Sequence, residues 1–221
     1  MSFVYCLIAS CTAQLLQTGT VFEFSAGSGN EPKIAVDSSG NAVVVWGQYD
    51  GGYRIFAKRY ATGQAWGAAQ IIDASLQDPN NNLAYRPQIA MDGNGSAIAV
   101  WEQPSLPSTS TAYNTWASRY VAGQGWGAAV VLENATSYNI LASPQVAMNA
   151  SGDAVVVWNR DNDIWANRFI LGQGWGVAGM IETSTPPAYD PRVVIDVSGN
   201  ATAVWRQSDG TADSIWANRL Q

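Results

Sequence analysis

Histidine is absent from the 221-residue chain. This absence excludes metal sites built on imidazole, Ser-His-Asp and Cys-His catalysis, and a histidine pH switch. Charged residues make up only 13% of the chain, about half the usual share of a soluble domain. The 11 Lys and Arg residues form no dense block and are outnumbered by 17 Asp and Glu residues. We therefore expect neither nucleic acid nor an anionic membrane surface as a partner.

Long apolar runs are also missing. The apolar run near the N-terminus, residues 3–9, is too short to cross a bilayer, which takes about 20 residues, so we expect no transmembrane span. Residues 8–11 (Ile-Ala-Ser-Cys) resemble a bacterial lipobox, and we interpret residues 1–19 as an imperfect export signal. The only cysteines, Cys6 and Cys11, lie outside the repeated body, so the fold does not depend on a disulfide framework. We expect an extracellular or cell-surface protein, with lipidation at Cys11 as an option.

What the sequence does contain is a four-fold internal repeat. Four segments of equal length align without gaps, each beginning with Pro and ending with Trp: Pro32 to Trp46, Pro87 to Trp101, Pro144 to Trp158 and Pro191 to Trp205. Each segment carries an Asp or Asn before a Gly, namely Asp37, Asp92, Asn149 and Asp196. A second block follows each segment and contains Arg59, Arg119, Arg168 or Arg219. Three of these blocks continue into a Gly-Gln-x-Trp-Gly connector, which holds Trp66, Trp126 or Trp175.

Each repeat unit is predicted to form about four strands. In the first unit, residues 34–36 and 42–46 are short, β-branched or aromatic, and bounded by turn residues. Residues 37–41 (Asp-Ser-Ser-Gly-Asn) have the chemistry of a hairpin loop, with Asp to cap backbone N–H groups and Gly to adopt a positive φ. The second block supplies another strand. Residues 71–73, which follow the connector, are expected to begin the second unit. Four strands in about 40–50 residues is the period of a β-propeller blade.

The sequence therefore predicts an all-β fold, a β-propeller of four blades with about four antiparallel strands each. A single domain is expected over residues 20–221, beginning with a strand at residues 21–24. Its blades are expected at about 20–61, 68–121, 128–170 and 177–221. We favour a closed four-bladed monomer, with half of an eight-bladed homodimer and an open array as alternatives. Variable loops at 74–86, 104–113 and 134–143 are expected on the blade faces.

The hairpin with its Asp, the following Gly-Asn-Ala and the closing Trp resemble the repeats of bacterial secreted β-propeller proteins. They are similar to the Asp-box hairpins of sialidase-like propellers and to lectin-type propeller repeats. The resemblance implies the propeller architecture over nearly the whole chain from about residue 20. It does not imply sialidase activity, because the Trp lies further from the Gly here than in an Asp box. Such families include lectins, glycosidases and scaffold modules, so the fold alone does not select a function.

The connector tryptophans Trp66, Trp126 and Trp175 have two interpretations. Each either fills the groove between adjacent blades or stacks on the apolar face of a sugar. We therefore take them as candidate ligand-binding residues, together with the neighbouring Gln64, Gln124 and Gln173. The repeated arginines are expected to make structural ion pairs or hydrogen bonds, since propeller symmetry spreads them around the rim. A structural role is also expected for the repeated Asp or Asn and for Trp46, Trp101, Trp158 and Trp205.

Metal and catalytic sites find little support in the sequence. The loop Asp92-Gly-Asn94-Gly-Ser96 has oxygen ligands at alternate positions but lacks the closing Glu of a calcium loop, so a hairpin turn is the better interpretation. We expect no metal and no cofactor. Glu102, Asp161 and Asp163 each occur in a single blade, but their spacing does not single out an acid–base pair. No catalytic residue is predicted.

The leading hypothesis is a non-enzymatic, extracellular propeller that binds carbohydrate or a cell-surface partner through repeated, lectin-like sites. The alternative is a structural or protein-interaction scaffold in a surface assembly. A glycosidase-like hydrolase is a third hypothesis.

Overall fold

The computed structural model describes residues 27–74, 83–104, 113–133, 143–183 and 185–221. The expected strand at residues 21–24, both cysteines and most of the three variable loops lie outside these residues. The described part consists of strands joined by turns. It contains no helix long and apolar enough to cross a membrane.

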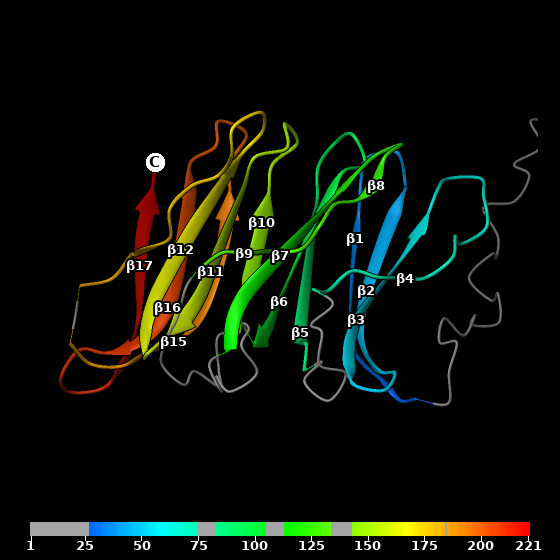
Figure 1. The fold of residues 1–221 in the computed structure, drawn as a ribbon. Helices are drawn as coiled ribbons and strands as arrows, with labels where there is room; N and C mark the ends of the chain where they lie inside the picture. Colours follow the sequence, from blue (N-terminus) through cyan, green and yellow to red (C-terminus); the bar gives the residue numbers. More distant parts are fainter. Residues whose placement is uncertain (1–26, 75–82, 105–112, 134–142, 184) are drawn as a thin grey trace, which may run out of the picture.

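The described strands form four antiparallel sheets, each of which is one blade (Figure 1). The first blade contains β1 (Gly29–Val36), β2 (Ala42–Tyr49), β3 (Tyr53–Tyr60) and β4 (Gln70–Ile71). The second contains β5 (Tyr85–Met91), β6 (Ala97–Pro104), β7 (Tyr113–Val121), β8 (Gly125–Trp126) and β9 (Val130–Val131). The third contains β10 (Gln145–Met148), β11 (Ala154–Arg160), β12 (Asp163–Ile170), β13 (Gly174–Trp175) and β14 (Gly179–Met180). The fourth contains β15 (Ala188–Ile195), β16 (Ala201–Ser208) and β17 (Asp213–Leu220). The predicted all-β fold of four blades is confirmed.

The strand after each connector belongs to a different blade from the one predicted. We expected residues 71–73 to begin the second blade, but β4 pairs with β3 of the first blade. In the same way, β9 pairs with β7 and β14 with β12. The cause is the connector, which folds back on the strand it follows, as the N–H of Gly67 donates to the carbonyl of Arg59. The returning chain therefore completes the blade that it has just left.

The turn between the first two strands of each blade is held by the repeated Asp or Asn. Oδ1 of Asp37 accepts the backbone N–H groups of Ser39 and Asn41, both at 2.9 Å. Oδ1 of Asn149 accepts the equivalent N–H groups, from Ser151 at 3.1 Å and Asp153 at 3.0 Å. The uncharged Asn149 thus makes the same two bonds, so the turn requires the oxygen and not the charge.

The hydrophobic core lies between neighbouring blades. The closing Trp of each later repeat packs on the central strands of the blade before it. Trp101 packs with Val43 and Val45 of β2, Trp158 with Ile98 and Val100 of β6, and Trp205 with Val155 and Val157 of β11. This packing explains why the strand sequences do not alternate between apolar and polar residues, since both faces of a central strand are covered.

The blades follow one another in chain order in Figure 1, from β1–β3 on the right to β15–β17 on the left. Extended contacts join each blade to the next one in the sequence. No comparably extended contact joins the strands of the first blade to those of the fourth within the described ranges. One face of each end blade is therefore left without a neighbouring blade in the described part.

Candidate functional site

The residue before the repeated Pro has an unusual backbone conformation in every blade. Glu31, Arg86, Ser143 and Asp190 have φ values of 49°, 54°, 42° and 55°. A positive φ is uncommon for any residue except Gly, and a residue that precedes Pro normally has an extended backbone. A shift of strand register accompanies this conformation in the first, second and fourth blades. Bulges of this kind redirect a side chain away from its usual face of the sheet.

The same four residues line one central pocket of about 200 Å³. The residues that follow each Pro complete its wall, namely Lys33, Gln88, Gln145 and Arg192. The first strands of all four blades thus meet at this pocket. We call the four pre-proline residues the pocket ring and the repeated Pro, Asp or Asn, Gly and Trp the repeat frame. The frame is nearly constant between blades, whereas the ring contains two carboxylates, a guanidinium and a hydroxyl.

A second pocket, of about 280 Å³, lies beside the first and brings two carboxyl groups to one place. It is lined by Glu31 and Arg86 of the ring and by Tyr85, Glu102 and Tyr113. Nη1 of Arg86 donates to both carboxylate oxygens of Glu102, at 3.1 and 3.0 Å. The backbone N–H of Arg86 donates to Oε2 of Glu31 at 2.9 Å. Arg86 therefore connects the two glutamates.

The two glutamates lie in different environments. Glu102 is 2% exposed, whereas Glu31 lies at the surface. Burial raises the pKa of the Glu102 carboxyl, and this effect outweighs the N–H of Ser143 and the charge of Arg86, which both lower it. Two carboxyl groups in contrasting environments are the usual arrangement for an acid and a base.

Tyrosines form one wall of this second pocket. The ring of Tyr85 lies 5.0 Å from that of Tyr53 and 6.2 Å from that of Tyr113, measured between centroids. Burial and the two neighbouring tyrosines raise the pKa of Tyr85 to about 12. Its hydroxyl is therefore protonated at neutral pH, and the pocket offers aromatic rings, tilted to one another, that carry polar hydroxyls.

The predicted connector residues lie away from both pockets. Trp66, Trp126 and Trp175 are half-buried, and each packs on an aromatic residue of its own blade at 5.4–5.6 Å between ring centroids. Gln64, Gln124 and Gln173 are exposed in the connector turns. None of the six is among the lining residues of the two central pockets. Their role in ligand binding stays a prediction.

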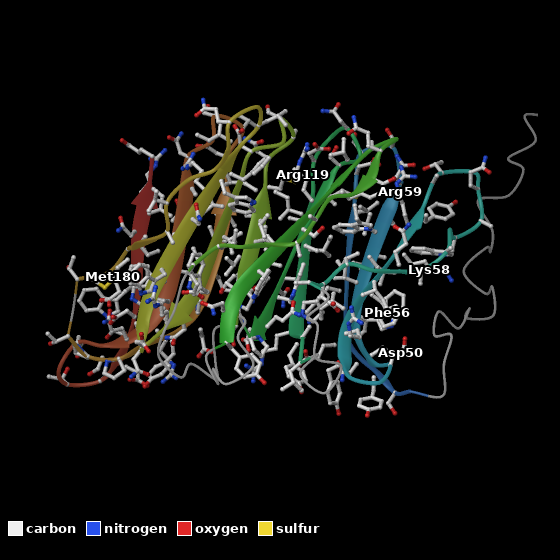
Figure 2. The ribbon with its side chains drawn as sticks, viewed as in Figure 1. Asp50, Phe56, Lys58, Arg59, Arg119 and Met180 are labelled. Atoms are coloured by element: carbon white, nitrogen blue, oxygen red, sulfur yellow. The ribbon has the colours of Figure 1, made fainter. Side chains whose placement is uncertain are left out.

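The repeated arginines link blades. Arg59 lies over the ring of Tyr120 in the second blade at 5.6 Å, and Arg119 over Phe169 in the third at 5.4 Å. Figure 2 shows these two arginines at the same end of neighbouring blades. Arg168 donates to the backbone carbonyl of Leu220 in the fourth blade at 3.2 Å. Each of these arginines reaches forward to the next blade, where it makes a cation–π or hydrogen-bond contact.

Of the three carboxylates that break the repeat, the structure brings only Glu102 to a central pocket. Asp161 lies in the turn between β11 and β12, and Asp163 is the first residue of β12. Burial and the nearby Glu182 raise the pKa of Asp163. Sequence reasoning missed the pocket ring, although the signal was present in the repeat alignment: a position next to an invariant Pro that differs in every blade.

The sequence matches no known family model and no curated protein. Its fold is similar to that of an α-L-arabinanase from Penicillium chrysogenum complexed with arabinobiose, with 12% identity over 86% of this chain and 62% of that chain and a TM-score of 0.58. A GH43 endo-arabinanase from Bacillus licheniformis has 13% identity over 86% of this chain and 70% of that one, with a TM-score of 0.51. A protein of unknown function from Dyadobacter fermentans has 11% identity over 90% and 67%, with a TM-score of 0.58. At these identities the likeness shows a shared propeller fold.

These comparisons contradict the prediction of a non-enzymatic, lectin-like propeller, its scaffold alternative and the expectation that the chain is not an enzyme. The similar structures with named activities include arabinanases. Sequence reasoning considered Glu102 but found no partner for it, because Glu31 is brought to the same pocket only by the fold.

Proposed function

We propose that the chain is a carbohydrate-cleaving propeller, a glycoside hydrolase whose reaction centre is the pair of central pockets. The observation that carries this proposal is the pair of carboxyl groups, buried Glu102 and exposed Glu31, joined by Arg86 in one cavity. Hydrolysis of a glycosidic bond needs one carboxyl group that holds a proton and one that is ionised. The named activities of the similar structures favour a substrate that contains arabinose.

The two glutamates take the two roles. Glu102, whose pKa is raised by burial, holds the proton and donates it to the glycosidic oxygen as the bond to the anomeric carbon breaks. Glu31 accepts a proton from the water that attacks that carbon. Arg86 positions both groups. Tyr85 and Tyr113 supply the surface on which the sugar ring packs.

The substrate class is consistent with the location expected from the sequence. We propose an extracellular or cell-surface enzyme, in keeping with the bacterial secreted propellers that its repeats resemble. Its partner is then a carbohydrate of a cell wall or cell surface.

The proposal is tested by the release of reducing sugar from arabinan and of nitrophenol from aryl α-L-arabinofuranosides. Glu102→Gln and Glu31→Gln should each lower kcat by about 10²–10⁴-fold, the usual contribution of a general acid or base. Activity of the native chain should decline as the pH rises past the raised pKa of Glu102, because the acid then loses its proton. Asp161→Asn is the matched control, since this carboxylate also breaks the repeat but lies outside both pockets. The proposal would be wrong if the native chain hydrolysed none of these substrates, or if Glu102→Gln kept full activity.

A further inference from the structure

The two ends of the blade series expose surfaces that are buried between blades elsewhere. We call the face that a blade turns to the next blade its forward face, and the opposite one its rear face. Ile55, Ile164 and Ile215 occupy the same forward position in the first, third and fourth blades. Ile55 and Ile164 are 0% exposed, whereas Ile215 is 77% exposed. The fourth blade therefore has a complete forward face with nothing packed on it in the described part.

The rear face of the first blade has the matching exposed strip. Ile34 and Val36 of β1 are each 64% exposed. The residues at their positions in the later blades pack on the core of the preceding blade: Ile89 and Met91, Val146 and Met148, and Val193 and Ile195. The rest of this rear face is already covered within its own blade, where Trp66 and Ala69 of the connector pack against Val44, Trp46 and Phe56. The open strip therefore follows β1.

The arginine links identify the same two ends. Arg59 and Arg119 each lie over an aromatic ring of the next blade, Tyr120 and Phe169. Arg219 is the equivalent arginine of the fourth blade, and its side chain is 63% exposed, with a 3.9 Å ion pair to Asp196 of its own blade. Tyr60 of the first blade stands at the position of Tyr120 and Phe169. One end thus presents the arginine and the other the aromatic ring.

We propose that two copies of the chain associate head to tail, with the forward face of the fourth blade of one copy on the rear strip of the first blade of the other. The junction would repeat the interface that the chain already forms three times internally. Ile215 and Val194 of one copy cover Ile34 and Val36 of the other, and Arg219 lies over the partner's Tyr60. Because Glu31 and Lys33 also lie on β1, the partner borders the central pocket on that side. This inference does not depend on the proposed hydrolysis.

The experiment measures molar mass by light scattering across a range of protein concentrations. The wild-type chain should form dimers or larger assemblies. Ile215→Lys places a charge on the forward face of the fourth blade, and Ile34→Lys places one on the rear strip of the first blade. Each variant has lost one of the two surfaces, so each alone should be monomeric. An equal mixture of the two should form a dimer, because each variant retains one intact surface and together they supply one junction. Arg219→Ala should weaken association about ten-fold or more and leave the thermal unfolding of the monomer unchanged.

Val197→Lys is the matched control. Val197 is 83% exposed, but it lies in the hairpin turn between β15 and β16 and outside both surfaces, so its change should not alter association. Three results would overturn the proposal. The first is a wild-type chain that is monomeric at every concentration. The second is continued association of Ile34→Lys alone, which would mean that two forward faces pair. The third is the absence of a dimer in the mixture.

Discussion

The repeat frame and the pocket ring belong to the same hairpins, yet the four blades agree in one and differ in the other. Asp37, Asp92, Asn149 and Asp196 all use a side-chain oxygen to accept the same two backbone N–H groups. Glu31, Arg86, Ser143 and Asp190 share a backbone conformation, but they comprise two carboxylates, a guanidinium and a hydroxyl. The residue type of a frame position is restricted, because its side chain must accept hydrogen bonds from the backbone of its own blade. The residue type of a ring position is not restricted in this way, because its side chain faces a shared cavity.

The largest effect is expected from breaking the frame at its buried Trp. Trp101 is fully buried against the first blade, and its Nε1–H donates to Oε1 of Gln103 at 2.9 Å. Trp101→Ala should lower the free energy of unfolding by about 3–5 kcal/mol, through lost burial and the cavity left behind. Urea unfolding measures this change. A loss below about 1 kcal/mol would mean that the stability of the fold does not depend on the packing of Trp101 between the first two blades.

Substitutions in the ring should have smaller and unequal effects. Arg86→Ala removes the hydrogen bonds from Arg86 to both side-chain oxygens of the buried Glu102, so it should cost about 1–3 kcal/mol. Asp190→Ala removes an exposed carboxylate with a surface ion pair to Arg206 at 3.4 Å, so the stability should change by at most about 0.5 kcal/mol. Urea unfolding of the two variants side by side gives the comparison. Equal losses would contradict the view that only ring members tied to a buried group support the fold.

The smallest effect is expected from removing the charge of a frame residue. Burial alone would raise the pKa of Asp37, but hydrogen bonds from Asn41 and Ser39 and the charge of Arg59 hold it below the usual 3.8. A carboxyl whose pKa is lower in the folded state stabilises the fold above its unfolded pKa, and this contribution disappears as the pH falls through the folded value.

Asp37→Asn keeps the turn oxygen, as Asn149 does, and should cause only a slight loss of stability at pH 7. That loss should vanish as the pH falls below about 3.8, the ordinary aspartate value. The measurement is the urea midpoint at pH 7 and at pH 3. The same loss at both pH values would mean that the charge of Asp37 has no role.

The frame could be predicted from the sequence because its residues act within one hairpin. Asp37 and Gly40 specify a turn by local hydrogen bonds and backbone conformation, and the Trp spacing gives the blade period. The ring is not specified within one hairpin, because Glu31 and Asp190 line the same cavity only when the first strands of four blades come together. The placement of β4 also failed, since the return of the chain after Gly67 depends on pairing with β3 and not on local propensity.

The left-handed backbone before each Pro has a consequence for how such a molecule can evolve. The conformation recurs with four different side chains, so it belongs to this position of the repeat and does not require one particular residue. Duplication of a blade therefore copies its strands together with one pre-proline position whose residue can change without altering them. A reaction centre can then be assembled, altered or erased by single substitutions, one per duplicate, while every strand stays in place.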